Sequence, residues 1–316
     1  MTGECGLVRS AERCVVVAAL AGLCGSFAAT ARASAMAGVS APALSLDAAE
    51  APAASESAPA DKWGYTLFNP TPRSLMRDFN ADRPDVTESP YTVDAGHYQL
   101  EFSFVEYTHD DDHGVKTDGL SVLPANLRIG VLNNLEIDLM ANPYENVLTH
   151  GNGISSRASG YGDMAVRAKV NFWGNDGGAT AGGVIPFLTI PTGQDGLSDH
   201  HVEGGVIFPL AVELPAGFDL GTQVEFDFDR NKKDDGYGME LVQTVTVGHD
   251  IVKNLSAYVE YVGVSPIDTG QTYLAYCDTG LMYLIGENME VDVGVNVGVS
   301  DHAPDYLVFS GMSFRY

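Results

Sequence analysis

The amino-acid sequence predicts an all-β fold, an up-and-down antiparallel β-barrel of about twelve strands that crosses a membrane. From residue 96 to residue 316, apolar and polar residues alternate with a period of two, most clearly over Met289–Ser300. Acidic side chains in these stretches fall on the polar parity, and the apolar parity is almost free of charge. Aromatic residues gather at strand ends on the apolar parity, as in the interfacial girdles of membrane barrels.

Composition excludes two other classes of protein. The chain of 316 residues carries 42 acidic and 17 basic residues, so its formal net charge is −25. A surface so poor in lysine and arginine does not pair with phosphate groups, which argues against nucleic acid as a partner. After residue 35 no apolar stretch is long enough for a transmembrane helix. The mean hydropathy of −0.01 still fits a barrel, because alternation averages hydropathy to near zero.

Residues 1–35 have the pattern of an export signal. Arg9 and Arg13 precede an apolar run over Cys14–Ala31, and small residues that suit cleavage follow. Removal of this segment leaves Cys277 as the only cysteine, so no disulfide can form within the mature chain. Residues 36–62 are rich in alanine, proline and serine and are predicted to be a flexible linker.

Residues 63–95 fit neither a linker nor a strand. The segment contains aromatic residues, several prolines and the charged residues Arg83, Asp85 and Glu88. Two interpretations stay open. The segment could fold into the lumen as a plug, with Asp85 and Glu88 paired to basic residues of the barrel wall, or it could close the barrel from the periplasm as a latch against the last strand.

The barrel itself is predicted to occupy residues 96–316, with short and long connections in alternation. Short links are expected at the periplasmic rim, and longer acidic, glycine-rich links, such as residues 109–119 and 142–160, are expected as external loops. The twelve predicted strands begin near His97, Leu120, Leu135, Met164, Gly183, Val202, Phe218, Met239, Leu255, Gln271, Met289 and Tyr306.

Alternation alone also fits a secreted, soluble β-sandwich binding module, in which the apolar face is packed inside. Two features favour the membrane barrel. The predicted strands are longer than those of typical sandwiches. The chain also ends on an alternating row that includes Phe314 and Tyr316, which is typical of the insertion signal read by the barrel-assembly machinery. We therefore expect outer-membrane lipid as the surrounding partner.

The polar parity supplies the candidate residues for the lumen and for selectivity. Acids outnumber bases among them, which predicts a water-filled interior that prefers cations. Together with Arg83, Asp85 and Glu88, the candidates are Glu101, Arg128, Glu136, Asp138, Arg167, Lys169, Glu225, Asp227, Glu240, Glu260, Asp278, Glu290 and Asp292. For a plug, the expected basic partners of Asp85 and Glu88 are Arg128, Arg167 and Lys169.

Metal binding and catalysis have little support in the sequence. His109, Asp111 and His113 form a weak candidate metal site, but a solvated acidic loop is the favoured interpretation. Apart from His97, the histidines are predicted to lie in loops or turns, away from any nucleophile fixed on the barrel wall. We therefore expect no cofactor and no enzymatic activity.

Several motifs resemble an outer-membrane family of phenol-degradation meta-pathway transporters. NPTP at residues 69–72, DRPDVTESP at 82–90 and TVDAGHYQLE at 92–101 resemble the start of its members, and GYGDMAVRAKV at 160–170 and IPTG at 190–193 are further similarities. The resemblance covers residues 69–316. It implies an outer-membrane channel or transporter of a Gram-negative-type bacterium, through which small molecules, often hydrophobic ones, pass passively.

Overall fold

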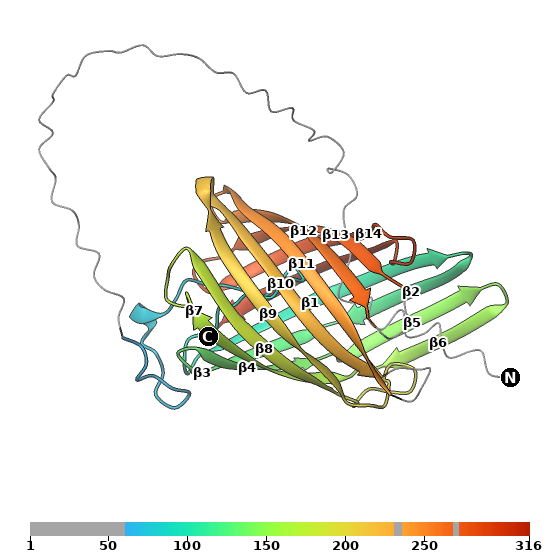
Figure 1. The fold of residues 1–316 in the computed structure, drawn as a ribbon, viewed down its shortest axis with the longest axis horizontal. Coiled ribbons are helices and arrows are strands. Elements are labelled where there is room, and N and C mark those ends of the chain that lie inside the picture. Colours follow the sequence, from blue (N-terminus) through green and yellow to red (C-terminus); the bar gives the residue numbers. More distant parts are fainter. Residues whose placement is uncertain (1–60, 231–235, 268–271) are drawn as a thin grey trace, which may run out of the picture.

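The computed structural model describes residues 61–230, 236–267 and 272–316, so the predicted signal peptide and the linker up to residue 60 lie outside it. The described chain forms one antiparallel sheet that closes on itself (Figure 1). Its strands are β1 (Tyr98–Asp112), β2 (Val115–Val122), β3 (Ala125–Leu132), β4 (Leu135–Ala141), β5 (Tyr144–Gly151), β6 (Ile154–Gly160), β7 (Met164–Trp173), β8 (Thr180–Ile190), β9 (Glu203–Leu214), β10 (Phe218–Arg230), β11 (Tyr237–Val252), β12 (Leu255–Pro266), β13 (Leu274–Leu284), β14 (Met289–Gly298) and β15 (Tyr306–Arg315).

The fifteen strands make twelve crossings of a closed barrel, as the sequence predicts. Strand β15 pairs with β1 and closes the ring. Three crossings are each divided into two strands: β2 and β3 at Leu123–Pro124, β4 and β5 at Asn142–Pro143, and β6 and β7 at residues 161–163. Proline has no backbone N–H to donate to a neighbouring strand, so the divisions at Pro124 and Pro143 follow directly from the sequence.

Two segments predicted as external loops are instead paired strands. Strand β1 continues to Asp112 and turns back into β2, and residues 142–160 largely form the β5–β6 hairpin. With the end of β1 they form an extension of the sheet that projects beyond the rest of the barrel (Figure 1). Polar side chains lie on both faces there, so the apolar alternation that marks the other strands is absent.

One rim carries the short connections and both ends of the described chain. The β3–β4, β7–β8, β9–β10, β11–β12 and β13–β14 connections lie there, and Tyr98 and Tyr316 exchange backbone hydrogen bonds (N to O 3.3 and 2.8 Å). In outer-membrane barrels short turns mark the periplasmic rim. The opposite rim, with the sheet extension and the longer links, is therefore external.

The barrel is apolar outside and charged inside. Val293 and Val308 on the outer face are 51% and 41% exposed, whereas Arg128 and Lys169 on the inner face are 1% and 0% exposed. A soluble sandwich would bury such a valine row against a second sheet, but here one sheet closes on itself. The alternative of a soluble β-sandwich is therefore wrong. Among the described residues, no helix is long and apolar enough to cross a membrane.

We predict that Val293→Lys destabilises the barrel in lipid by about 2–4 kcal/mol, because it places a charge at mid-strand in hydrocarbon. Guanidinium-induced unfolding in lipid vesicles measures this change. Val299→Lys is the matched control, since Val299 is 43% exposed but lies beyond the end of β14, where water is close. Equal stabilities of the two variants would contradict a lipid-facing position for Val293.

Candidate functional site

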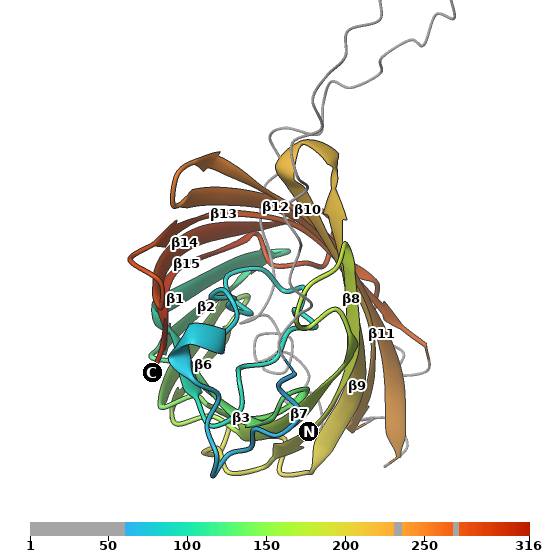
Figure 2. The same ribbon diagram turned by 90° about the vertical axis from the view of Figure 1, so that its left-hand side faces the viewer.

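The candidate site is the contact between the barrel wall and residues 76–95, which we call the inner segment. The chain before β1 passes through the ring of strands rather than around it (Figure 2). Apart from a single helical turn at Arg73–Leu75, residues 61–97 contain no helix or strand of the described chain. Polar and charged groups of strands on several sides of the lumen hold the inner segment.

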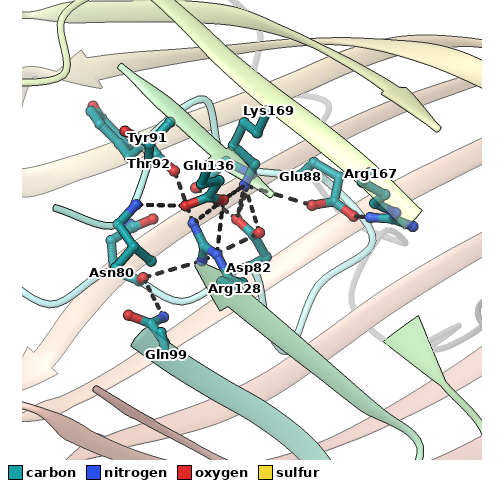
Figure 3. A network of polar contacts seen from close by, with 12 residues as sticks. Asn80, Asp82, Glu88, Tyr91, Thr92, Gln99, Arg128, Glu136, Arg167 and Lys169 are labelled. Carbon is teal, nitrogen blue, oxygen red and sulfur yellow. Dashed lines mark hydrogen bonds and ion pairs between the residues drawn. The ribbon is translucent and has the colours of Figure 1, made fainter. Parts of the chain in front are cut away.

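Asp82 of the inner segment lies between two buried cations of the wall (Figure 3). Lys169 Nζ on β7 is 2.5 Å from Asp82 Oδ2, and Arg128 Nη1 on β3 is 3.3 Å from the same oxygen. Arg128 also contacts Glu101 Oε1 at 2.8 Å and Glu136 Oε1 at 2.9 Å. Buried ions are tolerated only when paired, and Asp82 adds a third carboxylate to this cluster, one that comes from the inner segment and not from the wall.

The Asp82 carboxyl group is ionised in this setting. Burial acts to raise the pKa of Asp82, but the Arg128 and Lys169 cations outweigh it and hold that pKa below its ordinary value. Asp82 therefore stays charged throughout the neutral pH range. The pair between the inner segment and the wall persists under physiological conditions.

Carboxylates of the wall also accept hydrogen bonds from the backbone of the inner segment. Glu260 on β12 accepts from the N–H groups of Val86 and Thr87, both at 2.8 Å, and from the Thr87 hydroxyl. On β4, Glu136 Oε2 accepts from Val93 N–H at 2.5 Å. An irregular segment has no ladder partners, so these wall carboxylates satisfy its buried backbone.

Two arginine pairs cross-link the inner segment to opposite parts of the wall. Arg83 donates to both Asp292 oxygens on β14, at 3.0 and 2.7 Å, and its side chain passes Gly311, where a Cβ would lie 2.2 Å from Arg83 Nη2. Glu88 pairs with Arg167 on β7. The bidentate Arg83–Asp292 geometry fixes orientation as well as distance.

At the periplasmic rim, Asp176 in the β7–β8 turn binds two cations of the entering chain. Lys62 Nζ lies 2.7 Å and Arg77 Nε lies 2.9 Å from Asp176 Oδ1, and Arg77 Nη2 donates to the Asn133 carbonyl at 2.6 Å. Partial burial acts to raise the pKa of Asp176, but hydrogen bonds from Lys62, Arg77 and Asn133 lower it to about 2. The described chain is therefore fastened at the rim as well as in the lumen.

Most of the predicted lumen residues meet at these contacts, but Asp85 does not take its expected place. Glu88 pairs with Arg167, one of the expected partners. The expected pairing of Asp85 with a wall base is wrong, because Asp82 occupies Lys169 and Arg128 instead. Burial and the nearby Glu260 carboxylate raise the pKa of Asp85 well above its ordinary value.

Other predicted lumen residues lie on the wall away from the Asp82 cluster. Asp138 stands between Arg128 and Arg167 in the strand register and is fully buried. The remaining candidates on the lumen parity are Glu225 and Asp227 on β10, Glu240 on β11, Asp278 on β13 and Glu290 on β14. Strands β11, β12 and β13 contain no lysine or arginine.

The candidate metal residues do not converge. His109 Nδ1 lies 2.8 Å from Asp118 Oδ1 within the β1–β2 pair, His113 pairs with Asp112 in the turn, and Asp111 faces Lys116 at 3.4 Å. Among the described residues no group of three His, Cys, Asp or Glu side chains could hold a metal ion. His109 also lies on a strand, which corrects its prediction as a loop residue.

No sequence pattern indicated the contacts at the rim. Lys62, Arg77 and Asp176 lie in segments without periodicity, and charge alone does not identify partners so far apart in the chain. Phe314 and Tyr316, the predicted insertion signal, lie at the periplasmic rim and are 37% and 78% exposed.

Fold and site together define a class of protein, an outer-membrane-type β-barrel whose N-terminal segment lies inside its own lumen. The chain belongs to the family described as "Putative MetA-pathway of phenol degradation", whose model matches residues 81–316. That match begins one residue before Asp82 and includes most of the inner segment together with the whole barrel.

One solved structure supports the same fold. The chain is similar to the COG4313 outer membrane channel from Pseudomonas putida F1, with a TM-score of 0.55 and 9% identity over 75% of this chain and 100% of that one. The NanC porin matches with a TM-score of 0.44 and 12% identity, over 68% of this chain and 98% of that one. No curated protein sequence matches the chain.

We predict that Lys169→Met destabilises the protein by about 3–5 kcal/mol, because it leaves the buried Asp82 without its nearest cation and removes one of the two cations beside Glu136. Chemical unfolding in detergent micelles measures the loss. The double variant Lys169→Met/Asp82→Asn is expected to recover part of the lost stability, because it also removes the negative charge of Asp82. Additive effects of the two substitutions would show that Asp82 and Lys169 do not interact.

We predict that the rim contact at Asp176 withstands mild acid. A carboxyl group whose folded-state pKa is lowered stabilises the protein above its unfolded pKa, near 4, and loses this effect as the pH falls towards about 2. The stability difference between wild type and Asp176→Asn should therefore be constant above about pH 5 and vanish between pH 4 and pH 2. A difference that disappears already near neutral pH would contradict this ion cluster.

Proposed function

We propose that the protein is a passive outer-membrane channel for small molecules and that its inner segment acts as a plug. The observation that carries the proposal is the set of charged contacts between this segment and β3, β7 and β14. The family assignment and the similarity to a structure described as an outer membrane channel support it. The family description makes small phenolic compounds the first solutes to test.

The lumen supports a preference for cations. Towards β3 and β7 the inner segment presents the carboxylates of Asp82 and Glu88, which offset the basic residues there. Towards Glu260 it presents the N–H groups of Val86 and Thr87 and the Thr87 hydroxyl, with the Asp85 carboxyl group nearby. Strands β11, β12 and β13 contain no lysine or arginine, and carboxylates along a pore attract cations and repel anions.

The remaining parts of the proposal concern export and assembly. Residues 1–35 would direct export and be cleaved, residues 36–62 would link the mature N-terminus to the rim, and the barrel-assembly machinery would read the C-terminal strand with Phe314 and Tyr316. Solute passage needs no cofactor and no bond-making chemistry, and nucleic acid takes no part in it.

We predict that locking the inner segment to the wall suppresses conductance. Thr87 Oγ1 and Thr244 Oγ1 on β11 are 2.5 Å apart, so cysteines at both positions can form a disulfide without large movement. The background carries Cys277→Ser, which removes the only cysteine of the barrel. In planar bilayers the oxidised double variant should conduct less than the same protein after reduction, and a salt gradient should give a cation-selective reversal potential.

The single variant Thr87→Cys in the same background controls for the reductant. Conductance that is identical before and after reduction of the double variant would show that the inner segment does not act as a plug. A wild-type protein and a reduced variant that both fail to conduct would contradict the channel proposal itself.

A further inference from the structure

Two large aromatic side chains stand out from the chain just before it enters the barrel. Trp63 is 69% exposed and Phe68 is 93% exposed. Both belong to residues 62–69, which we call the entry loop. Large apolar side chains that are this exposed indicate a surface that contacts an environment less polar than water.

The exposure does not come from a loose end. Within the entry loop, Tyr65 N–H donates to the Lys62 carbonyl at 3.1 Å, and Thr66 and Asn69 exchange two backbone hydrogen bonds of 2.9 and 3.0 Å. Lys62 is buried and bound to Asp94 at 3.2 Å and to Asp176 at 2.7 Å. Hydrogen bonds within the loop therefore stabilise it, and the ion pairs of Lys62 fix it to the rim, while its two aromatic rings remain exposed.

The entry loop continues the barrel wall at the periplasmic end of β3. Leu67 N–H donates to the Val131 carbonyl at 2.8 Å, and Thr66 forms a bridge with Leu132, which is 40% exposed. The loop is thus joined to the last residues of a membrane-crossing strand, at the level where the lipid-facing surface ends.

This part of the rim lacks aromatic side chains of its own. On the strands that flank the β3–β4 pair, Tyr98 of β1 is 43% exposed and Phe172 of β7 is 61% exposed. Strands β3 and β4 contain no aromatic residue, and their turn is Asn133-Asn134. The entry loop brings Trp63 and Phe68 to the sector where the girdle formed by the neighbouring strands is interrupted.

We propose that the entry loop binds the lipid–water interface of the periplasmic leaflet, with Trp63 and Phe68 as its anchors. Tryptophan favours this zone because its ring is apolar and its N–H remains close to polar headgroups. Continuity with the exposed aromatic residues of β1 and β7 selects lipid as the occupant, ahead of a periplasmic protein or the residues before 61. The proposal stands whether or not the channel conducts.

The anchor changes how the inner segment is held. Ion pairs fix residues 77–94 to the wall, and Trp63 and Phe68 fix the start of the same chain to the membrane. Withdrawal of the inner segment towards the periplasm would then have to extract two aromatic rings from lipid as well as break the ion pairs. Rearrangement within the lumen leaves the anchor in place.

The chain offers a direct spectroscopic test, because Trp63 and Trp173 are its only tryptophans. The full chain carrying Trp173→Phe, which leaves Trp63 as the sole emitter, is reconstituted into phosphatidylcholine vesicles with bromine placed near the headgroup or deep in the acyl chains. We expect shallow bromine to quench Trp63 roughly twofold more than deep bromine does, as an interfacial ring requires. The matched variant Trp63→Phe reports Trp173, and heat-modifiable migration in gels confirms folding.

Each other outcome overturns the proposal. Quenching by aqueous acrylamide but not by brominated lipid would place Trp63 in water. Quenching by neither reagent would show that protein covers the ring. As a second variant, Phe68→Ser in the Trp173→Phe background should reduce the shallow-bromine quenching of Trp63 in a folded barrel, and unchanged quenching would remove Phe68 from the anchor.

Discussion

The structure depends on one constraint, the pairing of charges inside a wall whose outer face must be apolar. Lipid leaves no place for charge on the outside, so the strands carry their ions inwards, where Arg128 and Lys169 are almost completely buried. Buried ions need partners. Glu101 and Glu136 provide partners from the wall, and Asp82 provides a further one from a segment that is not part of the barrel. Barrel and inner segment are therefore joined through one buried charge cluster.

The same contacts make any opening of the lumen costly. If the inner segment moved, Arg83 and Asp292 would part, and Glu260 would lose three donors. Water would have to replace each contact, so these contacts stabilise the inner segment in its position inside the barrel. Gly311 on β15 also fits this position of the inner segment, because any side chain at residue 311 would overlap the Arg83 side chain.

Much of the barrel follows from the sequence, because lipid imposes a strict period of two. The strand starts at Leu135, Met164, Phe218, Leu255, Met289 and Tyr306 agree with the structure, and so does the twelve-crossing barrel. The signal fails where lipid is absent. The β5–β6 hairpin is polar on both faces and looks like a loop. The inner segment shows no alternation of apolar and polar residues. Its charged residues can be read from the sequence, but no pattern indicated that Asp82 rather than Asp85 contacts the basic residues of the wall.

The contacts of the inner segment differ from one side of the wall to the other. Its carboxylates, Asp82 and Glu88, lie against the basic residues of β3 and β7, whereas Glu260 accepts hydrogen bonds from its backbone. Strands β11, β12 and β13 contain no lysine or arginine. In the channel that we propose, one segment would therefore influence both occlusion and ion preference, because the contacts that hold it in the lumen are also the contacts that neutralise the basic side of the wall.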